Sequence, residues 1–414
     1  MTRVMLLIAI SFCWSSCAAF GQEVKPGPLM LMGGFERPEN SLVWDEFVDQ
    51  SGGPGRRVAV IAAASADPEY YGWKMMDHLK RLSLKPELIP SGAIFSSDFR
   101  VLLNEPDSVT RVLESDAILL LGGDQSRYRD FLIHSDGSDL PMLKAIREVH
   151  RRGGLIAGTS AGTAVMSRIM FVDGQSPYFM LKKGLDIDQE LGQGFGFLPD
   201  EWFVDQHFLA RGRLARMLVA MQKVGFQFGL GVDEDSAITI DGQGQARVVG
   251  TRGVLVVDAS QAEIDSNANG FNWKNLRLSY LSHGDQMDLA TRRIKISSHR
   301  ENERKVQDNA NRDVSEASVR VYNDIFHHVS LPNLMFDVLQ DPSSVCVGLC
   351  LSQEDDANDE TQDGFQLCMT TTAESVAREG FFGLGDPISV LHIRADISPI
   401  RVKVTRHENS KPKP

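Results

Sequence analysis

The chain has 414 residues, of which 42% are hydrophobic and 24% are charged, so it is long enough for two or three globular domains with a sizeable core. Its formal net charge of −12 argues against a sequence-independent nucleic-acid binder, because such a protein needs a basic surface to displace counterions. Beyond the first residues, no hydrophobic run is long enough to cross a membrane.

Residues 1–21 are predicted to be a signal peptide. Arg3 supplies a positive charge, and the apolar stretch from Val4 to Trp14 is too short to remain in a bilayer. We therefore expect a secreted or periplasmic protein whose mature chain begins near Gln22. A lipoprotein acylated on Cys17 is the alternative, although the leucine usually found three residues before such a cysteine is absent.

Apolar runs alternate with helical patterns over the next part of the chain. The expected strands are 29–32, 57–63, 86–89, 117–121 and 155–157, and the expected helices are 70–82, 107–114 and 140–151. This alternation predicts an α/β fold with a mostly parallel sheet and helices on both faces. Loops after the carboxyl ends of such strands form the site, and Gly33-Gly34 and Gly122 to Gln125 fall there.

Residues 153–168 contain a G-x-S-x-G turn between a short apolar strand and a stretch that suits a helix. This is the sequence form of a nucleophile elbow with Ser160 at its tip. Gly158 and Gly162 suit the turn because a strand that runs directly into a helix crowds its own backbone. Taken alone, the motif is also compatible with an incidental serine in a glycine-rich turn.

Further elements follow the elbow. They are a strand at 202–204, a helix that opens with Arg211, Arg213 and Arg216, a strand–turn–strand unit at 229–240, and a β-meander at 246–250 and 253–258 that closes the sheet. The turn of the strand–turn–strand unit carries three consecutive carboxylates, Asp233, Glu234 and Asp235. We place the end of this domain, residues 22–293, near Arg293.

The chain changes character after residue 293. Residues 294–314 are interpreted as a linker or an exposed helix, and residues 315–414 as a small β-rich extension. The extension is expected to hold a helix at 334–339 and strands at 345–351, 365–369 and 388–404. Its acidic stretch at 353–363 lacks the alternating carboxylates and central glycine of an EF-hand, so we interpret it as a solvated loop.

Only Cys346, Cys350 and Cys368 remain after removal of the signal peptide. An odd number of cysteines cannot all pair within one chain, so at most one disulfide is expected. No fourth ligand accompanies them, so a zinc site is not expected.

Four motifs in this order resemble those of the cyanophycinases, which are serine peptidases of family S51 related to the aspartyl dipeptidases. The motifs are Gly122-Gly-Asp-Gln, Gly158-Thr-Ser-Ala-Gly, Asp205-Gln-His-Phe followed by the three arginines, and Gly229-Leu-Gly-Val-Asp-Glu-Asp. The resemblance covers about residues 29–293. It implies a glutamine-amidotransferase-like, flavodoxin-like sandwich with a nucleophile elbow.

By this resemblance Ser160 is the nucleophile, His207 the base and Glu234 the third catalytic residue. A serine hydroxyl needs a base to accept its proton, and the imidazole needs a carboxylate to fix its tautomer and stabilise its cation. Taken alone, His207 is more readily a core histidine at the end of a strand. A shift of one residue in the acidic turn would direct Asp233 or Asp235 inward instead of Glu234.

The resemblance also implies an oxyanion hole and a substrate pocket. The expected oxyanion donors are the backbone N–H of Ala161 and that of Gly33 or Gly34, although Gly33-Gly34-Phe35-Glu36 replaces the more usual three glycines. The residues expected to line the pocket are Gln125, Asp205, Gln206, Arg211, Arg213 and Arg216. Arginines form paired hydrogen bonds to carboxylates, and Asp205 suits a cationic group. A salt-bridged helix face without a ligand is the alternative.

The sequence therefore predicts a secreted serine peptidase that cleaves β-aspartyl peptide bonds through an acyl-enzyme. The simplest substrate is cyanophycin, a polyaspartate that carries arginine on each β-carboxylate, with β-Asp-Arg as the product. A peptidase for other aspartyl or β-aspartyl peptides is a close variant, and a non-catalytic protein that binds an acidic peptide is an alternative of a different class. No metal or organic cofactor is implied, and the resemblance favours a homodimer.

Overall fold

The computed structural model describes residues 25–90, 99–265, 270–298, 302–305, 318–326, 330–340, 344–352, 361–379 and 388–403. The predicted signal peptide, Cys17 and most of the acidic stretch at 353–363 lie outside these residues. In the part of the chain that is described, no helix combines the length and the apolar character needed to cross a bilayer.

The first sheet has a parallel centre. Its parallel strands in the described chain are β1 (Leu29–Met32), β2 (Arg57–Ile61), β3 (Lys85–Ile89), β4 (Ala117–Leu120) and β5 (Leu155–Thr159). Antiparallel strands extend it beyond β1: β10 (Ser236–Ile240), β11 (Gln245–Gly250), β14 (Gln286–Asp288) and β15 (Ile294–Lys295). The resulting order is β15-β14-β11-β10-β1-β5-β4-β2-β3, which confirms the α/β prediction.

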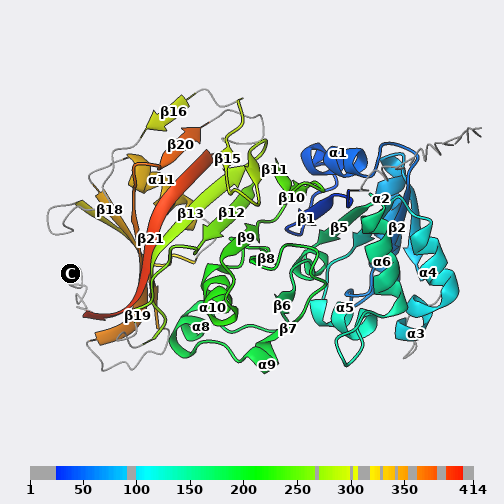
Figure 1. The fold of residues 1–414 in the computed structure, drawn as a ribbon. Coiled ribbons are helices and arrows are strands. Elements are labelled where there is room, and N and C mark those ends of the chain that lie inside the picture. Colours follow the sequence, from blue (N-terminus) through cyan, green and yellow to red (C-terminus); the bar gives the residue numbers. More distant parts are fainter. Residues whose placement is uncertain are drawn as a thin grey trace, which may run out of the picture.

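Helices connect the strands of the first sheet and pack against it (Figure 1). They are α1 (Ser41–Gln50), α2 (Pro68–Arg81), α3 (Phe99–Asn104), α4 (Pro106–Leu113), α5 (Gln125–Leu132), α6 (Pro141–Arg151) and α7 (Ala161–Ala164). Helix α2 begins where the Asp67 side chain accepts a hydrogen bond from the Tyr70 N–H and Pro68 takes the first helical position. The helices predicted at 70–82, 107–114 and 140–151 are therefore present, shifted by one or two residues.

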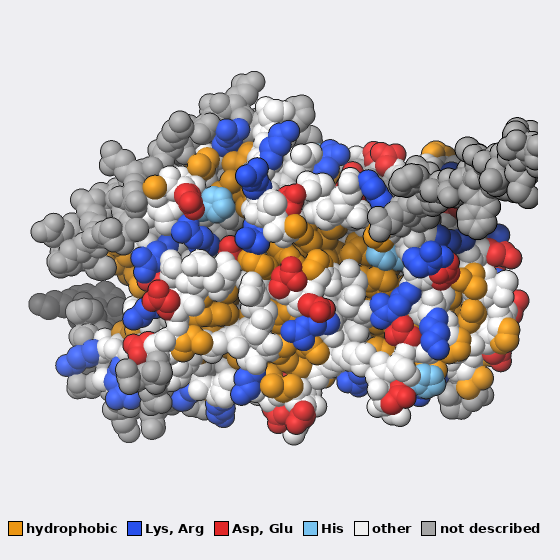
Figure 2. Space-filling view, in the orientation of Figure 1, with side chains coloured by type: hydrophobic (Ala, Val, Ile, Leu, Met, Phe, Trp, Pro, Cys, Tyr) orange, Lys and Arg blue, Asp and Glu red, His pale blue; other side chains and the backbone are white. Residues whose placement is uncertain are grey.

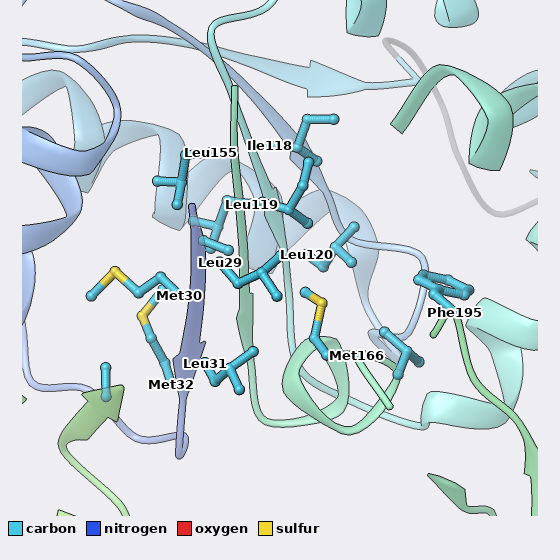
Figure 3. Close-up of a cluster of buried hydrophobic side chains, with 14 of the residues drawn as sticks. Leu29, Met30, Leu31, Met32, Ile118, Leu119, Leu120, Leu155, Met166 and Phe195 are labelled. Carbon is cyan, nitrogen blue, oxygen red and sulfur yellow. The ribbon is translucent and has the colours of Figure 1, made fainter. Parts of the chain in front are cut away.

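The core of this half lies around the parallel strands. All four side chains of β1 are buried, because strands covered on both faces carry continuous apolar runs. Figure 3 shows Met30 and Met32 on one side of β1 and Leu31 on the other, where it packs near Leu120 and Met166. This packing holds the carboxyl ends of β1, β4 and β5 together, and the candidate site lies at those ends.

The chain forms smaller elements after α7. These are β6 (Ile169–Phe171), α8 (Pro177–Lys183), α9 (Ile187–Glu190), β7 (Leu191–Gln193) and α10 (Leu214–Val224). Helix α10 begins at Leu214, so Arg211 and Arg213 precede the helix that they were predicted to open. The reason is Gly212, whose φ of +60° lies in the left-handed region and cannot belong to a right-handed helix.

A second sheet combines strands from both predicted regions of the chain. It contains β8 (Trp202–Gln206), β9 (Phe228–Val232), β12 (Gly253–Asp258) and β13 (Trp273–Ser282), together with β16 (Asn302–Lys305), β17 (Ser318–Tyr322), β18 (Ser344–Leu351), β19 (Thr361–Thr370), β20 (Val376–Glu379) and β21 (Ile388–Lys403). Its main order in the described chain is β17-β18-β19-β21-β13-β12-β9-β8. The long strand β21 crosses the left half of Figure 1 beside β13.

Hydrophobic packing continues across the second sheet. Helix α11 (Ser330–Gln340) covers strands of the C-terminal region, and its Leu334 belongs to the same buried cluster as Met217 of α10, Leu255 of β12 and Ile393 of β21. The strands predicted at 345–351, 365–369 and 388–404 correspond to β18, β19 and β21. The division of the chain near residue 293 stays a prediction, although β13 and β21 pair directly across it.

One predicted pairing is wrong. Strands β11 and β12 do not form a meander, because β11 pairs with β10 and β14 whereas β12 pairs with β9 and β13 of the other sheet. The connection between them is held by Asp235, whose side chain accepts from the Thr251 hydroxyl, and by Ser236, whose hydroxyl accepts from the Arg252 N–H. These bonds turn the chain from one sheet into the next.

Within the described chain, Cys346, Cys350 and Cys368 lie on β18 and β19 and form no disulfide. The residues at 294–295 and 302–305, which were interpreted as linker or exposed helix, form the short strands β15 and β16.

Candidate active site

Ser160 occupies a tight turn between β5 and α7. Its φ of 53° and ψ of −113° lie outside the regions that a side-chain-bearing residue prefers, which is strain of the kind found at functional sites. A Cβ on Gly158 would lie 2.1 Å from the Gly162 carbonyl oxygen, and one on Gly162 would lie 2.2 Å from that of Leu120. The predicted elbow is therefore present, and glycine is required at both flanking positions.

His207 follows β8 and contacts the elbow. Its backbone N–H donates to the Gly33 carbonyl oxygen at 2.8 Å, which anchors the residue at a φ of 47°. Its Nε2 lies 2.8 Å from Ser160 Oγ, and its Nδ1 lies 2.8 Å from Glu234 Oε1. An ionised carboxylate only accepts hydrogen bonds, so we assign the proton to Nδ1, which leaves Nε2 to accept from the serine hydroxyl.

The acidic turn between β9 and β10 directs one carboxylate to His207. Asp233 is turned away, and its carboxylate accepts from the Ala210 N–H at 3.1 Å and from Arg252 at 3.3 Å. Asp235 is also engaged elsewhere, and its carboxylate accepts from Arg37, Asn40 and Thr251. Glu234 is therefore the member of the three that contacts the imidazole.

The surroundings of His207 keep its imidazole neutral. Burial lowers the pKa of His207, and the positive charges of Arg211 and Arg213 lower it further, to about 3. The Glu234 carboxylate at 2.8 Å opposes this shift, since a negative neighbour favours the imidazolium. At neutral pH the imidazole is free to accept a proton, as a general base must be.

The predicted oxyanion donors differ in their availability. Ala161 begins α7 directly after Ser160, as expected of one donor. Gly33 and Gly34 are engaged elsewhere: the Gly33 N–H donates to the Ser236 carbonyl at 2.9 Å, and the Gly34 N–H donates to the Glu36 carboxylate at 2.6 Å. In this conformation neither glycine is free to bind an oxyanion, which differs from the prediction.

The loop after β4 lies against the elbow, a contact that was not predicted from the sequence. A Cβ on Gly122 would lie 3.1 Å from Ser160 Cβ and 3.5 Å from Ser160 Oγ. The backbone of Gly122 therefore lies against the serine side chain, and a larger residue there would require that side chain to shift by a few tenths of an ångström. The glycine pair at 122–123, which follows a buried strand, was the available signal.

Glu36 and Phe35 are site residues to which the sequence reasoning gave no role. Glu36 also accepts from the Thr159 hydroxyl at 2.6 Å, and burial raises its pKa to about 6. The Phe35 ring meets the His207 ring edge-on with centroids 5.0 Å apart, yet it is 70% exposed. Both residues stand where this chain departs from the usual three glycines, and that departure was the available signal.

Three of the predicted pocket residues bind one another. Asp205 is only 2% exposed and forms two hydrogen bonds of 2.6 Å with Arg216, and it lies 3.3 Å from Arg213. Burial raises the pKa of Asp205, but Arg216 and Arg213 outweigh it and hold the pKa below its ordinary value. The Asp205 charge is thus balanced within the protein, as in the alternative of a salt-bridged face.

The remaining amides and Arg213 complete this network. Arg213 donates to the backbone oxygen of Gln206 at 2.6 Å and to its side-chain oxygen at 2.7 Å. The Gln125 side chain donates to the Phe171 carbonyl at 2.6 Å, and the Arg216 guanidinium lies 4.6 Å from the centre of the Phe171 ring. These residues form a continuous network of contacts that ends at Gln206, the residue before His207.

Arg211 differs from the other two arginines. It lies in the turn after His207, where its backbone N–H donates to the His207 carbonyl at 3.0 Å, and it is exposed. Among the described residues its guanidinium has no hydrogen-bond or ion-pair partner. Of the three predicted arginines, Arg211 is therefore the one whose charge is available to a ligand.

A serine hydroxyl bonded to a buried imidazole above a parallel sheet is the arrangement of a serine hydrolase. Residues 29–248 match peptidase family S51, and the chain belongs to this family. The resemblance stated from the motifs is thereby confirmed. Family membership also confirms the predicted enzyme class, a serine-type peptidase.

Named relatives and a solved structure are similar to this chain. The cyanophycinase of Synechococcus elongatus is 30% identical over 276 residues, which cover 65% of this chain and 81% of the relative. The cyanophycinase of Trichormus variabilis is 30% identical over 288 residues, which cover 67% of this chain and 91% of the relative. The crystal structure of a peptidase from an acI-B1 Actinobacterium is 20% identical, with a TM-score of 0.46, and covers 65% of this chain and 99% of its own.

Proposed function

We propose that this S51 peptidase hydrolyses the main-chain amide bonds between the aspartates of cyanophycin, so that β-Asp-Arg is released with its β-aspartyl bond intact, and that it uses Ser160, His207 and Glu234 as its catalytic residues. The observation that carries the proposal is the pair of 2.8 Å contacts that joins Ser160 Oγ to His207 and His207 to Glu234. This continuous contact supports proton transfer from the hydroxyl to the imidazole.

In the proposed reaction, Ser160 Oγ attacks the carbonyl carbon of the scissile amide and its proton passes to His207 Nε2. Glu234 stabilises the imidazolium that forms. His207 then gives the proton to the leaving nitrogen as the C–N bond breaks, which leaves an acyl-enzyme. Water attacks the ester, gives a proton to His207, and releases the acid as the proton returns to Ser160. The balance is one amide and one water consumed for one acid and one amine.

The choice of cyanophycin is supported by the relatives and by Arg211. Two relatives at 30% identity are named cyanophycinases. Each repeat of cyanophycin carries a free carboxylate on its arginine, and the exposed guanidinium of Arg211 next to His207 suits such a group. The buried network of Asp205, Arg213 and Arg216 is proposed to hold His207 and Arg211 in position.

The proposal is tested by incubating the purified protein with insoluble cyanophycin and analysing the soluble products by mass spectrometry. Soluble β-Asp-Arg is expected from the intact protein and not from Ser160→Ala. Thermal unfolding and circular dichroism check that the variant keeps its fold. Polymer that sediments with the protein but releases no dipeptide would identify a binding protein instead.

A panel of α- and β-aspartyl dipeptides assayed in parallel defines the substrate class. Faster cleavage of the dipeptides than of the polymer would favour the variant hypothesis, a peptidase for other aspartyl peptides. The polymer-directed proposal expects the reverse order of rates.

Export and dimer formation are further parts of the proposal. They are supported by the positive charge and short apolar stretch at the start of the sequence and by the family resemblance. Secretion predicts that the protein recovered outside the cytoplasm begins near Gln22. Lipidation at Cys17 would instead yield a membrane-bound protein that is released by Cys17→Ala. Sedimentation velocity distinguishes the expected homodimer from a monomer.

A further inference from the structure

A cavity of about 520 Å³ lies where the peptidase region meets the C-terminal strands. One wall comes from the start of α8 and from the turn that holds Arg211, and the other comes from residues of the C-terminal region, among them Asp324, Phe326 and Gln362. Its volume lies within the range of small-molecule binding pockets, about 300–1,000 Å³. The cavity therefore has room for one unit of a peptide-like ligand.

The two walls are in direct contact beside the candidate active site. A Cβ on Gly212 would lie 2.5 Å from the carbonyl oxygen of Phe326, so the C-terminal region packs against the backbone of the turn that follows His207. Because Gly212 stands between Arg211 and Arg213, this contact fixes the turn from which the Arg211 side chain extends. The cavity and the site beside Ser160 thus share Arg211.

The cavity carries two opposite charges that no described residue pairs. Arg211 lines one wall and Asp324 the other, and in the described chain neither has a hydrogen-bond or ion-pair partner. The carboxylate of Asp324 acts on one other lining group: burial, and then the charge of Asp324, raise the pKa of the Cys350 thiol to about 12. An exposed cation and an exposed anion across one cavity suit a ligand that carries both charges.

Aromatic rings complete the lining. Tyr178 and Phe179 at the start of α8 face the cavity together with Phe326. Ring faces of this pair already attract cations, because the Lys182 amine lies 5.2 Å from the Tyr178 ring centre and the Lys183 amine lies 4.7 Å from that of Phe179. A planar guanidinium stacks on such rings more readily than an ammonium does.

We propose that this cavity is a second subsite, formed jointly by the peptidase region and the C-terminal region, that binds an aspartyl–arginine unit of a polymeric substrate. Arg211 binds the carboxylate of the arginine, and Asp324 binds its guanidinium against the aromatic rings. The inference rests on the proposed function, since it takes the same polymer as ligand. It assigns to the C-terminal region the selection of chains longer than a single unit.

The test uses the Ser160→Ala protein, so that binding is measured without turnover. Calorimetry compares one β-Asp-Arg unit with a soluble oligomer of four units. The oligomer is expected to bind more tightly than the single unit, and Asp324→Asn is expected to weaken oligomer binding by about two- to fivefold, the range for one exposed charged contact. The affinity for the single unit is expected to change less.

Two further variants control the interpretation. Glu374→Gln removes one exposed carboxylate from the same region at a position that pairs with Arg277 outside the cavity lining, and it is expected to bind the oligomer as the parent does. Asp324→Glu keeps the charge and is expected to retain most of the oligomer affinity. Thermal unfolding of each variant shows whether its fold is kept.

The outcomes separate the subsite from the proposed function. If the parent gains affinity with oligomer length and Asp324→Asn keeps that gain in full, the subsite is wrong while cyanophycin remains the substrate. If the parent binds neither oligomer nor single unit, and the intact enzyme releases no β-Asp-Arg from the polymer, the proposed function fails and the assigned ligand fails with it.

Discussion

The carboxylate of Glu36 accepts a hydrogen bond from the backbone N–H of Gly34 at 2.6 Å, next to the strand end that carries Ser160. The same carboxylate accepts from the Thr159 hydroxyl at 2.6 Å. Burial raises the pKa of Glu36 to about 6, because the two hydrogen bonds compensate only part of the lost hydration. An acid that titrates near neutral pH therefore stands within the candidate site.

Glu36→Gln is expected to stabilise the protein above pH 6. A carboxyl whose pKa is raised in the fold contributes stability that is present below its ordinary value of 4.5 and is lost as the pH rises through 6. Glutamine keeps both contacts, since its oxygen accepts from Gly34 and its nitrogen donates to Thr159. The gain in unfolding free energy is at most about 2 kcal/mol, from about 1.5 pKa units at 1.36 kcal/mol each.

Urea unfolding of both proteins at pH 4.5 and pH 7.5 measures this difference. A gain at pH 7.5 that shrinks at pH 4.5 agrees with the expectation. An equal difference in unfolding free energy at both pH values would mean that ionisation of Glu36 does not destabilise the folded protein.

Ser160→Gly is expected to be more stable than Ser160→Ala by about 1 kcal/mol, although neither variant should be active. The positive φ of residue 160 strains any residue that carries a Cβ, and glycine is free of that strain. Differential scanning calorimetry of the two inactive variants makes the comparison without an effect of the hydroxyl. Equal unfolding temperatures would show that the elbow stores no strain at this residue.

Glu234→Gln is expected to lower activity, and Asp235→Asn is expected to lower stability. Glu234→Gln should lower kcat by about 10³-fold or more, because the imidazolium loses its carboxylate, while the unfolding free energy changes little. Asp235→Asn should cost about 2 kcal/mol of stability, because the nearly buried carboxylate anchors Arg37, Asn40 and Thr251.

Steady-state kinetics and urea unfolding on both variants give the answer. A large loss of kcat in Asp235→Asn with its stability intact would assign the third catalytic role to the wrong carboxylate. Because the His207 imidazole contacts Glu234 and not Asp235, we expect Asp235→Asn to keep its kcat.

The acid limb of kcat/KM is expected below the ordinary histidine pKa of 6.5. Burial, Arg211 and Arg213 lower the pKa of His207 to about 3, so the base stays unprotonated in mild acid. Arg211→Gln removes one of these positive charges and should move the limb to higher pH. The folded protein also binds this proton more weakly than the unfolded chain, so stability falls as the pH drops below 6.5.

The profile is best measured in the Glu36→Gln background, because the titration of Glu36 near pH 6 would overlap with it. A limb that Arg211→Gln leaves in place, or moves to lower pH, would contradict the electrostatic account of His207.

The parallel half of the fold was predictable because its signals are local. The buried run at 117–121 and the glycines at 158 and 162 each report on their own strand or turn. The partners of β11 and β12 could not be predicted from the sequence. Two apolar strands separated by two residues are as compatible with a meander as with pairing in two different sheets. The contacts of Asp235 and Ser236, which separate them, lie outside the two strands.

The candidate site was predictable in its residues but not in all of their contacts. The family motifs led to Ser160, His207 and Glu234, which the structure brings together, although their catalytic roles stay predictions. Which of three adjacent carboxylates turns inward depends on partners such as Asn40, almost two hundred residues away. The availability of the Gly34 N–H also depends on a contact that the motifs do not show, because this N–H donates to the carboxylate of Glu36.

Figure 2 shows acidic and basic side chains interspersed over one face of the molecule, with hydrophobic side chains between the two halves. No large patch of a single sign is visible on this face. The charges on this face are therefore scattered individual residues rather than a charged surface.

Strand β13 is hydrogen-bonded on one side to β12 and on the other to β21. Truncation of the chain after residue 293 would remove β21, the second partner of the ten-residue strand β13. The exposed backbone of β13 would then be open to self-association. The same sheet carries β8 and β9, which lead into His207 and Glu234. Trimming or transplanting the peptidase region by itself would therefore disturb the support of its own imidazole and carboxylate.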